Sequence, residues 1–305
     1  MAKDPAKQPK RDAQPSGMTR RDFVAFSVTA GVAVTAGCAA EDTADDMSQE
    51  IEVVEEDVEI TTPDGTADAA YIHPRTGAYA GVLIWTDAFG LRPSFRAMAR
   101  RLAADGYSVL VPNPFYRVER APSFPDASTV IFQEVGARLG SLMGSITAAD
   151  AAERDASAYI PFLDAQPQVD TSKKIGTQGY CMGGPLIVRT AAAFPDRIGA
   201  AASFHGGGLV TANPNSPHLL APSIQARMYF GIASNDDATQ PAAKDVLRET
   251  FADAGVVAEI EVYSDAQHGW CVTDMPAQGG PPIYNEVDAE RAWGKLLELY
   301  EEALA

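Results

Sequence analysis

Short apolar runs alternate with amphipathic segments along most of the chain. Residues 51–74 alternate apolar and polar positions around a turn at 63–65, which predicts an opening β-hairpin. Further strands are predicted at residues 82–85, 108–111, 174–179, 199–204, 228–233 and 258–263. Helices are predicted at residues 92–105, 150–163, 185–194, 242–254 and 285–304. Residues 115–147 break this rhythm, and we expect a loop with short helices there.

The alternation of strands and helices predicts an α/β fold with a mostly parallel central sheet and helices on both faces. Residues 51–305 are enough for one such domain with a full core. Right-handed crossovers would place the carboxyl ends of the parallel strands along one edge of the sheet. Ligands of such folds bind at that edge.

A glycine-rich turn follows the strand predicted at 174–179. Its sequence, Gly-Tyr-Cys-Met-Gly-Gly over residues 179–184, has the nucleophile-elbow pattern G-x-S-x-G with Cys181 in place of serine. The following helix start would favour the thiolate form of the cysteine. Two structural interpretations stand beside this one: Cys181 could be a small buried apolar residue, or it could form a disulfide with Cys271.

Acid and base candidates follow in the chain order of α/β-hydrolases, nucleophile, then acid, then histidine. Asp236 and Asp237 come just after the strand predicted at 228–233, and His268 follows the last predicted strand. Both aspartates remain candidates for orienting His268. His205 ends a strand and Trp270 neighbours His268, so both are candidate substrate-binding residues.

These motifs resemble the dienelactone hydrolase family over residues 55–303. The segment Asp-Ala-Phe-Gly-Leu at 87–91 is similar to the family's Glu-x-Phe-Gly-Leu, whose glutamate contacts the nucleophile and helps to control its ionisation. The resemblance therefore implies a nucleophile-modulating role for Asp87. It also implies an oxyanion hole formed by the backbone N–H groups of Met182 and Ala88.

The same resemblance implies an α/β-hydrolase fold and cleavage of a carboxylic ester or lactone through a Cys-His-Asp triad and an acyl-enzyme. Residues 112–117 are similar to a family segment in which a basic residue holds a substrate carboxylate, so Arg117 is a candidate anion clamp. The Ser-Asn-Asp stretch matches the family's acid position, which favours Asp236 over Asp237.

The N-terminal region has the pattern of an export signal. Residues 18–26 read MTRRDFVAF, and an apolar run and small residues follow, which predicts a twin-arginine signal over residues 1–38. Thr-Ala-Gly-Cys, ending at Cys38, resembles a lipoprotein cleavage box, so Cys38 is a candidate membrane tether. Residues 39–50 read as an acidic linker, and we expect a periplasmic or other extracytoplasmic protein.

Composition narrows the function classes. The chain carries 24 Lys and Arg against 41 Asp and Glu, a net charge of −17, which disfavours nucleic acid and anionic membrane surfaces as partners. The sequence contains no metal-ligand cluster and no dinucleotide-binding glycine pattern, so we expect no metal and no cofactor. The expected partner is a small ester or lactone, with an anionic substrate as one alternative, bound by a monomer or small homo-oligomer. A non-catalytic exported binding protein on a hydrolase scaffold is the competing hypothesis.

Overall fold

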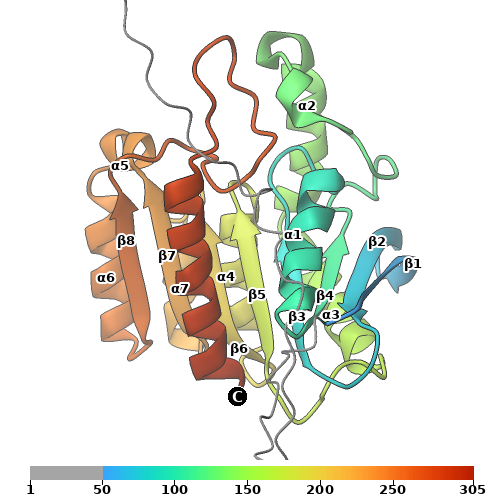
Figure 1. Cartoon of the computed structure of the whole chain (residues 1–305). Coiled ribbons are helices and arrows are strands. Elements are labelled where there is room, and N and C mark those ends of the chain that lie inside the picture. The colour runs from blue at the N-terminus through green and yellow to red at the C-terminus, as the bar shows by residue number, and fades with distance from the viewer. Residues whose placement is uncertain (1–50) are drawn as a thin grey trace, which may run out of the picture. The chain divides into compact units, whose positions relative to one another are not determined.

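A computed structural model describes residues 51–305 (Figure 1). The predicted export signal at 1–38, with Cys38, and the acidic linker at 39–50 lie outside the described residues. The described chain forms an eight-stranded sheet in the order β1-β2-β4-β3-β5-β6-β7-β8. The six strands from β3 to β8 run parallel, whereas β1 pairs antiparallel with β2 and β2 pairs antiparallel with β4.

The strands agree with the sequence-based expectations to within a few residues. Their bounds are β1 Val53–Thr62, β2 Gly65–Pro74, β3 Ala80–Trp85, β4 Tyr107–Pro112, β5 Ile175–Tyr180, β6 Ile198–Phe204, β7 Arg227–Ala233 and β8 Ala258–Tyr263. Strands β3, β5 and most of β6 are buried on both faces, which explains why they read as continuous apolar or small-residue runs.

Helices cover both faces of the sheet. On one face lie α1 (Pro93–Ala104) and α7 (Glu286–Leu304). On the other lie α3 (Ala151–Asp164), α4 (Gly183–Ala193) and α6 (Ala243–Asp253) (Figure 1). The short helix α5 (Ser234–Thr239) follows β7 directly, and two 3₁₀ segments, Ala127–Thr129 and Pro217–Ser223, lie in connecting loops. The prediction of an α/β fold with a mostly parallel sheet is confirmed.

Residues 115–147 differ from expectation because they contain one long helix, α2 (Phe132–Thr147). Glycines at 136, 140 and 144 lower its intrinsic helix propensity, and a Cβ at any of them would meet no atom within 4 Å. Leu142 and Ile146 are its buried residues. Val135, Leu139 and Met143 are partly buried and pack against the same core, so an apolar face holds the helix despite its glycines.

The core consists of one apolar layer on each side of the sheet. Trp85, Tyr159 and Ile187 belong to the layer under α3 and α4. Phe95, Tyr180 and Leu296 belong to the layer under α1 and α7. Within residues 51–305, no helix is long and apolar enough to cross a membrane. The two layers fix the parallel strands, so that their carboxyl ends form one edge that carries the predicted site residues.

Candidate active site

Close packing determines the shape of the turn that carries Cys181. A Cβ added at Gly179 would lie 2.2 Å from the carbonyl oxygen of Gly183. One added at Gly183 would lie 2.4 Å from the carbonyl oxygen of Trp85, and one at Gly184 would lie 2.5 Å from the Cα of Gly206. Each approach is too close for any side chain. The three glycines are therefore required for the strand β5, the turn and helix α4 to pack as they do.

Cys181 itself is held in a backbone conformation that non-glycine residues rarely adopt, with φ at 51°. Its N–H donates to the carbonyl of Phe204 at 3.1 Å, and its carbonyl accepts from Gly207 at 3.3 Å. Both bonds tie the turn to the end of β6. The strained turn leaves the Cys181 side chain half-buried at the carboxyl edge of the sheet, directly before α4. The nucleophile-elbow geometry predicted from the sequence is present.

Asp236 and His268 lie together at the same edge. The Nδ1 atom of His268 is 2.8 Å from Oδ2 and 3.0 Å from Oδ1 of Asp236. Both side chains are part-buried, with 28% of His268 and 31% of Asp236 exposed. Asp237, the alternative acid, forms an ion pair with Lys244 instead, at 2.6 and 2.8 Å. The structure therefore places Asp236 and not its neighbour at the histidine.

The loop that carries His268 is attached to α5 by bonds that the sequence did not predict. The side chain of Asn235 accepts a hydrogen bond from the backbone N–H of His268 at 2.8 Å. The backbone N–H and hydroxyl of Ser234 both donate to the carbonyl of Ala266, at 2.9 and 2.7 Å. All three residues of the Ser-Asn-Asp stretch thus contact the histidine or its loop. The stretch fixes the histidine ring relative to the end of β7.

The electrostatic surroundings of His268 favour its protonated form. Burial works against the charged imidazolium, but the hydrogen bond with Asp236 and the nearby Cys181 sulfur outweigh it and raise the pKa of His268 to about 10. The charges of the same two partners act in the same direction. His268 therefore carries a proton at neutral pH between a carboxylate and a sulfur atom. That arrangement joins Cys181, His268 and Asp236 in one chain of interactions.

His205 and Trp270 line the inner side of this group. The ring of His205 lies edge-on to the rings of His268 and Trp270, with centroids 4.8 and 5.2 Å apart. Burial, and secondarily the charge on His268, hold the pKa of His205 well below its usual range. His205 is therefore neutral, and both of its ring nitrogens lack a hydrogen-bond partner within the described chain. The two predicted substrate-binding residues are buried and form the wall behind His268.

Met182 and Ala88 are the predicted oxyanion-hole residues. Both are buried, and they lie at the start of α4 and in the loop after β3, respectively. Within residues 51–305 neither backbone N–H donates to another group of the protein. Free N–H groups at a helix start are suited to hold a developing negative charge.

Asp87 does not have the surroundings that the resemblance implied. Its carboxylate forms two bonds to the guanidinium of Arg92, at 2.6 and 2.8 Å, and accepts the N–H of Phe89 at 2.9 Å. Arg92 is completely buried and also pairs with Asp274 at 2.8 Å. The expectation that Asp87 contacts the nucleophile is corrected accordingly, since its bonds are used to hold the loop of Ala88. The sequence-based reasoning missed Arg92, although an arginine inside the apolar Phe-Gly-Leu-Arg-Pro segment was a signal.

Arg117 also differs from expectation. Its guanidinium bonds to Asp64 at 2.7 and 3.0 Å and to Asp155 at 2.6 and 3.0 Å. Asp155 is fully buried, so this pair is part of the structural core at the hairpin. The prediction of an anion clamp is corrected, because two carboxylates already occupy the donors of Arg117.

The cysteines, the possible metal ligands and the remaining histidines have simple surroundings. Cys181 and Cys271 are both free, which contradicts the alternative of a disulfide between them. Burial raises the pKa of the Cys271 thiol. Among residues 51–305 no group of three or more His, Cys, Asp or Glu side chains could hold a metal ion. The remaining histidines bond locally, His73 to the carbonyl of Pro74 and His218 to Ser216.

The strand order and the nucleophile turn define an α/β-hydrolase. Residues 68–304 match the dienelactone hydrolase family, so the chain belongs to that family and is a hydrolase. Carboxymethylenebutenolidase of Rhodococcus opacus is 27% identical over 244 residues, covering 79% of this chain and 88% of the relative.

Solved structures agree with this fold. The structure titled m3DLH superposes with a TM-score of 0.69 at 24% identity, covering 83% of this chain and 99% of its own. A dienelactone hydrolase-like promiscuous phosphotriesterase from metagenomic libraries gives a TM-score of 0.68 at 22% identity, with the same coverage. At these identities the structures establish the fold and leave the reaction to be argued from the site.

Proposed function

We propose that this hydrolase cleaves a carboxylic ester or lactone through a thioester acyl-enzyme on Cys181. The observation that carries the proposal is the hydrogen-bonded pair of Asp236 and His268 at the carboxyl ends of β7 and β8, on the same sheet edge as Cys181 after β5. Nucleophile, base and orienting acid in this arrangement are the parts of a hydrolytic triad. The substrate class also agrees with the name of the Rhodococcus opacus relative, carboxymethylenebutenolidase.

In the first half-reaction the Cys181 thiolate attacks the substrate carbonyl carbon, and the carbonyl oxygen becomes an oxyanion. The backbone N–H groups of Met182 and Ala88 would stabilise that charge. As the intermediate collapses, the bond to the alkoxy oxygen breaks and His268 gives it a proton. The acyl group remains on sulfur as a thioester, and His268 is left neutral.

In the second half-reaction neutral His268 takes a proton from water, and the resulting hydroxide attacks the thioester. Collapse releases the carboxylic acid and returns the sulfur to its thiolate form, beside a protonated His268. Asp236 accepts a hydrogen bond from Nδ1 throughout, which fixes the imidazole tautomer and stabilises the imidazolium. His205 and Trp270 keep water from the inner side of the ring by their packing.

The ion pairs at the same edge favour an uncharged substrate. Arg92 is bonded to Asp87 and Asp274, and Arg117 to Asp64 and Asp155. A substrate carboxylate would have to displace one of these acids. We therefore propose that neutral esters or lactones are cleaved in preference to their carboxylate-bearing analogues.

The test is hydrolysis of p-nitrophenyl acetate by the purified protein before and after iodoacetamide. Activity should be lost on alkylation, and Cys181→Ala should be inactive with an unchanged melting temperature. Cys271→Ala is the matched control: it should be active and still be inactivated by the reagent. Inactivation that depends on Cys271, or full activity of Cys181→Ala, would refute the nucleophile assignment.

A non-catalytic binding protein on the same scaffold is the competing function. It would show no turnover of any ester or lactone in a substrate panel. A turnover that disappears in Cys181→Ala excludes it.

We also propose that residues 1–38 direct export by the twin-arginine route, on the evidence of the paired Arg20 and Arg21 before the apolar run. Replacing both arginines by lysine should keep the protein in the cytoplasm of the expressing bacterium. Labelling with radioactive palmitate, compared with Cys38→Ala, tests the lipid tether. Fractionation that is unchanged by the double replacement would refute the export route.

A further inference from the structure

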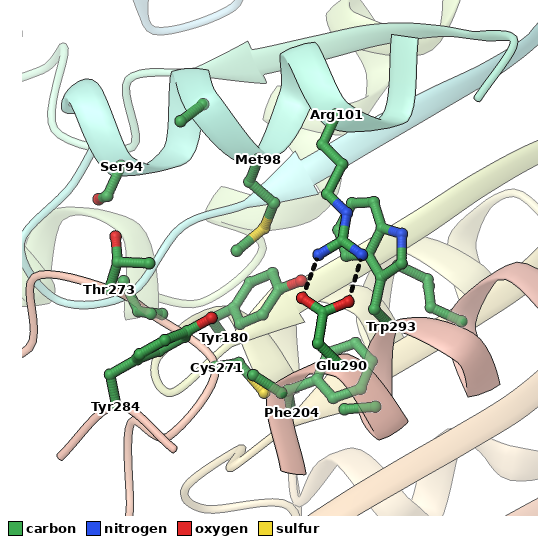
Figure 2. Close-up of a pocket in the computed structure, with 15 residues that line it drawn as sticks. Ser94, Met98, Arg101, Tyr180, Phe204, Cys271, Thr273, Tyr284, Glu290 and Trp293 are labelled. Carbon is green, nitrogen blue, oxygen red and sulfur yellow. Dashed lines mark hydrogen bonds and ion pairs between the residues drawn. The ribbon is translucent and has the colours of Figure 1, made fainter. Parts of the chain in front are cut away.

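A pocket lies between α1 and α7, and Tyr180, the residue before Cys181, forms part of its wall (Figure 2). Its volume is about 180 Å³. Its walls include Met98 from α1, Phe204 from the end of β6, and Trp293 and Leu296 from α7. None of the three triad residues lines it. The pocket is therefore a separate site from the one that holds the reactive sulfur.

The charges at the pocket neutralise each other. Arg101 of α1 makes two bonds to Glu290 of α7, at 2.7 and 2.5 Å, drawn as dashed lines in Figure 2. The guanidinium of Arg101 also lies over the ring of Trp293, 4.3 Å from its centroid. Because each charged group is already paired, an ionic ligand would gain no free counter-charge. The pocket is suited to a neutral molecule.

One buried polar group in the pocket wall, the hydroxyl of Tyr180, donates no hydrogen bond to the described chain. The hydroxyl of Tyr180, a fully buried side chain, accepts a hydrogen bond from Gln178 at 2.8 Å. Its own O–H donates to no acceptor within the described chain, although a buried donor is normally paired. Thr273 and Tyr284 add two further hydroxyl side chains to the lining (Figure 2). A ligand oxygen would complete the bonding of Tyr180.

The size of the pocket limits the rest of the ligand. An apolar cavity of about 150 Å³ accommodates one benzene ring. We propose that the pocket between α1 and α7 binds a neutral single-ring molecule with one oxygen substituent, of the phenol class. The ring packs between Met98 and Trp293, and the oxygen accepts a hydrogen bond from the hydroxyl of Tyr180. The site is independent of the proposed ester hydrolysis, so its test needs no activity measurement.

The experiment is a titration of the full chain, labelled with ¹³C-methyl methionine, with 4-cresol. Met98 lines the pocket, whereas Met182 adjoins Cys181, so their methyl resonances separate the two sites. The Met98 resonance, assigned with Met98→Leu, should shift saturably, because an aromatic ring would lie beside it. A saturable shift at Met182 with no change at Met98 would overturn the proposal, as would the absence of any saturable shift.

Two variants of α7 test whether 4-cresol occupies this pocket. Ala289 on α7 lines the pocket, so Ala289→Phe should fill it and weaken 4-cresol binding at least tenfold. The matched control is Val287→Phe on the same helix, where the side chain is 80% exposed, and it should bind as the wild type does. Equal affinity in Ala289→Phe and the wild type would contradict the assigned location.

Tyr180→Phe tests the hydrogen bond. In the wild type 4-cresol should bind roughly fivefold more tightly than toluene, because 4-cresol forms one hydrogen bond that toluene cannot form. In Tyr180→Phe the two ligands should bind equally. An unchanged preference for 4-cresol in this variant would overturn the role of Tyr180.

Discussion

Two acid–base pairs at the same sheet edge have opposite properties. Arg92 and Asp87 are fully buried, and every carboxylate and guanidinium group in their cluster, including Asp274, has a charged partner. His268 and Asp236 are part-exposed, and the histidine has a second interaction with a sulfur atom. In the first pair every charged group is already bonded to another, and the pair holds the loop of Ala88 in place. The second pair holds a proton that can be transferred, and this difference separates ion pairs that only hold the structure from the pair that we propose to be catalytic.

Breaking the part-exposed pair should have the largest effect. Asp236→Asn should lower kcat/KM for p-nitrophenyl acetate by about 10³- to 10⁴-fold, because the imidazole loses the partner that fixes its tautomer. The melting temperature at neutral pH should fall as well, because the protonated imidazole loses the partner that stabilises it. The neighbouring Asp237→Asn is the matched control and should retain wild-type kinetics, since Asp237 pairs with Lys244. Equal losses in the two variants would contradict the assignment of the acid.

Breaking the buried pair should act on stability. Arg92→Met should lower the free energy of unfolding in urea by about 4 kcal/mol, because it leaves the Asp87 carboxylate buried without a counter-charge. Arg120→Met, at an exposed ion pair with Glu59, should cause no measurable change. An Arg92→Met protein as stable as the wild type would show that the cluster does not hold the loop.

The pH dependence sharpens the comparison, because the pKa of His268 differs strongly between the folded and the unfolded chain. The pKa of His268 is raised to about 10 in the folded chain, from an unfolded value of about 6.5. The protonated imidazole therefore adds stability that is fully present below about pH 6.5 and is lost as the pH rises through about 10. The stability difference between wild type and His268→Gln should shrink between these limits. A difference that grows with pH would contradict the raised pKa.

A small effect is expected for the part-exposed pair of Asp237 and Lys244, which does not contact His268. Asp237→Asn should lower the free energy of unfolding by about 0.5–1 kcal/mol, because its ion pair with Lys244 is partly solvated. Chemical denaturation of this variant beside Arg92→Met compares the two kinds of pair directly. A loss as large as that of Arg92→Met would mean that burial does not explain the difference.

Local sequence patterns predicted most strands and helices, and they placed Asp236 and His268 at strand ends, where the two side chains meet. The strand ends position Cys181, Asp236 and His268, and strand periodicity is a local property. The distant partners of Arg92 and Arg117 were not predictable in this way. Arg92 meets Asp274 across 182 positions, and Arg117 meets Asp64 across 53. Such pairs are set by the packing of distant elements.

Helix α2 and the bonds of the His268 loop were not predicted either, for reasons other than distance along the chain. In α2 the three glycines hide a helix that packs through a few residues. Asn235 reads as an ordinary turn residue, and its bond to the N–H of His268 becomes evident once α5 and the loop after β8 are placed together. The residues that hold the His268 loop are thus harder to predict than the contact between Asp236 and His268.

The most direct test of the central claim is to trap the acyl group. The purified protein is mixed rapidly with p-nitrophenyl butyrate, quenched in acid, digested and mapped by mass spectrometry. The account predicts a butyryl group on the peptide that contains Cys181, formed in step with a burst of p-nitrophenolate and absent from Cys181→Ala. Steady hydrolysis with no acyl group on Cys181, or with the acyl group on another residue, would contradict it.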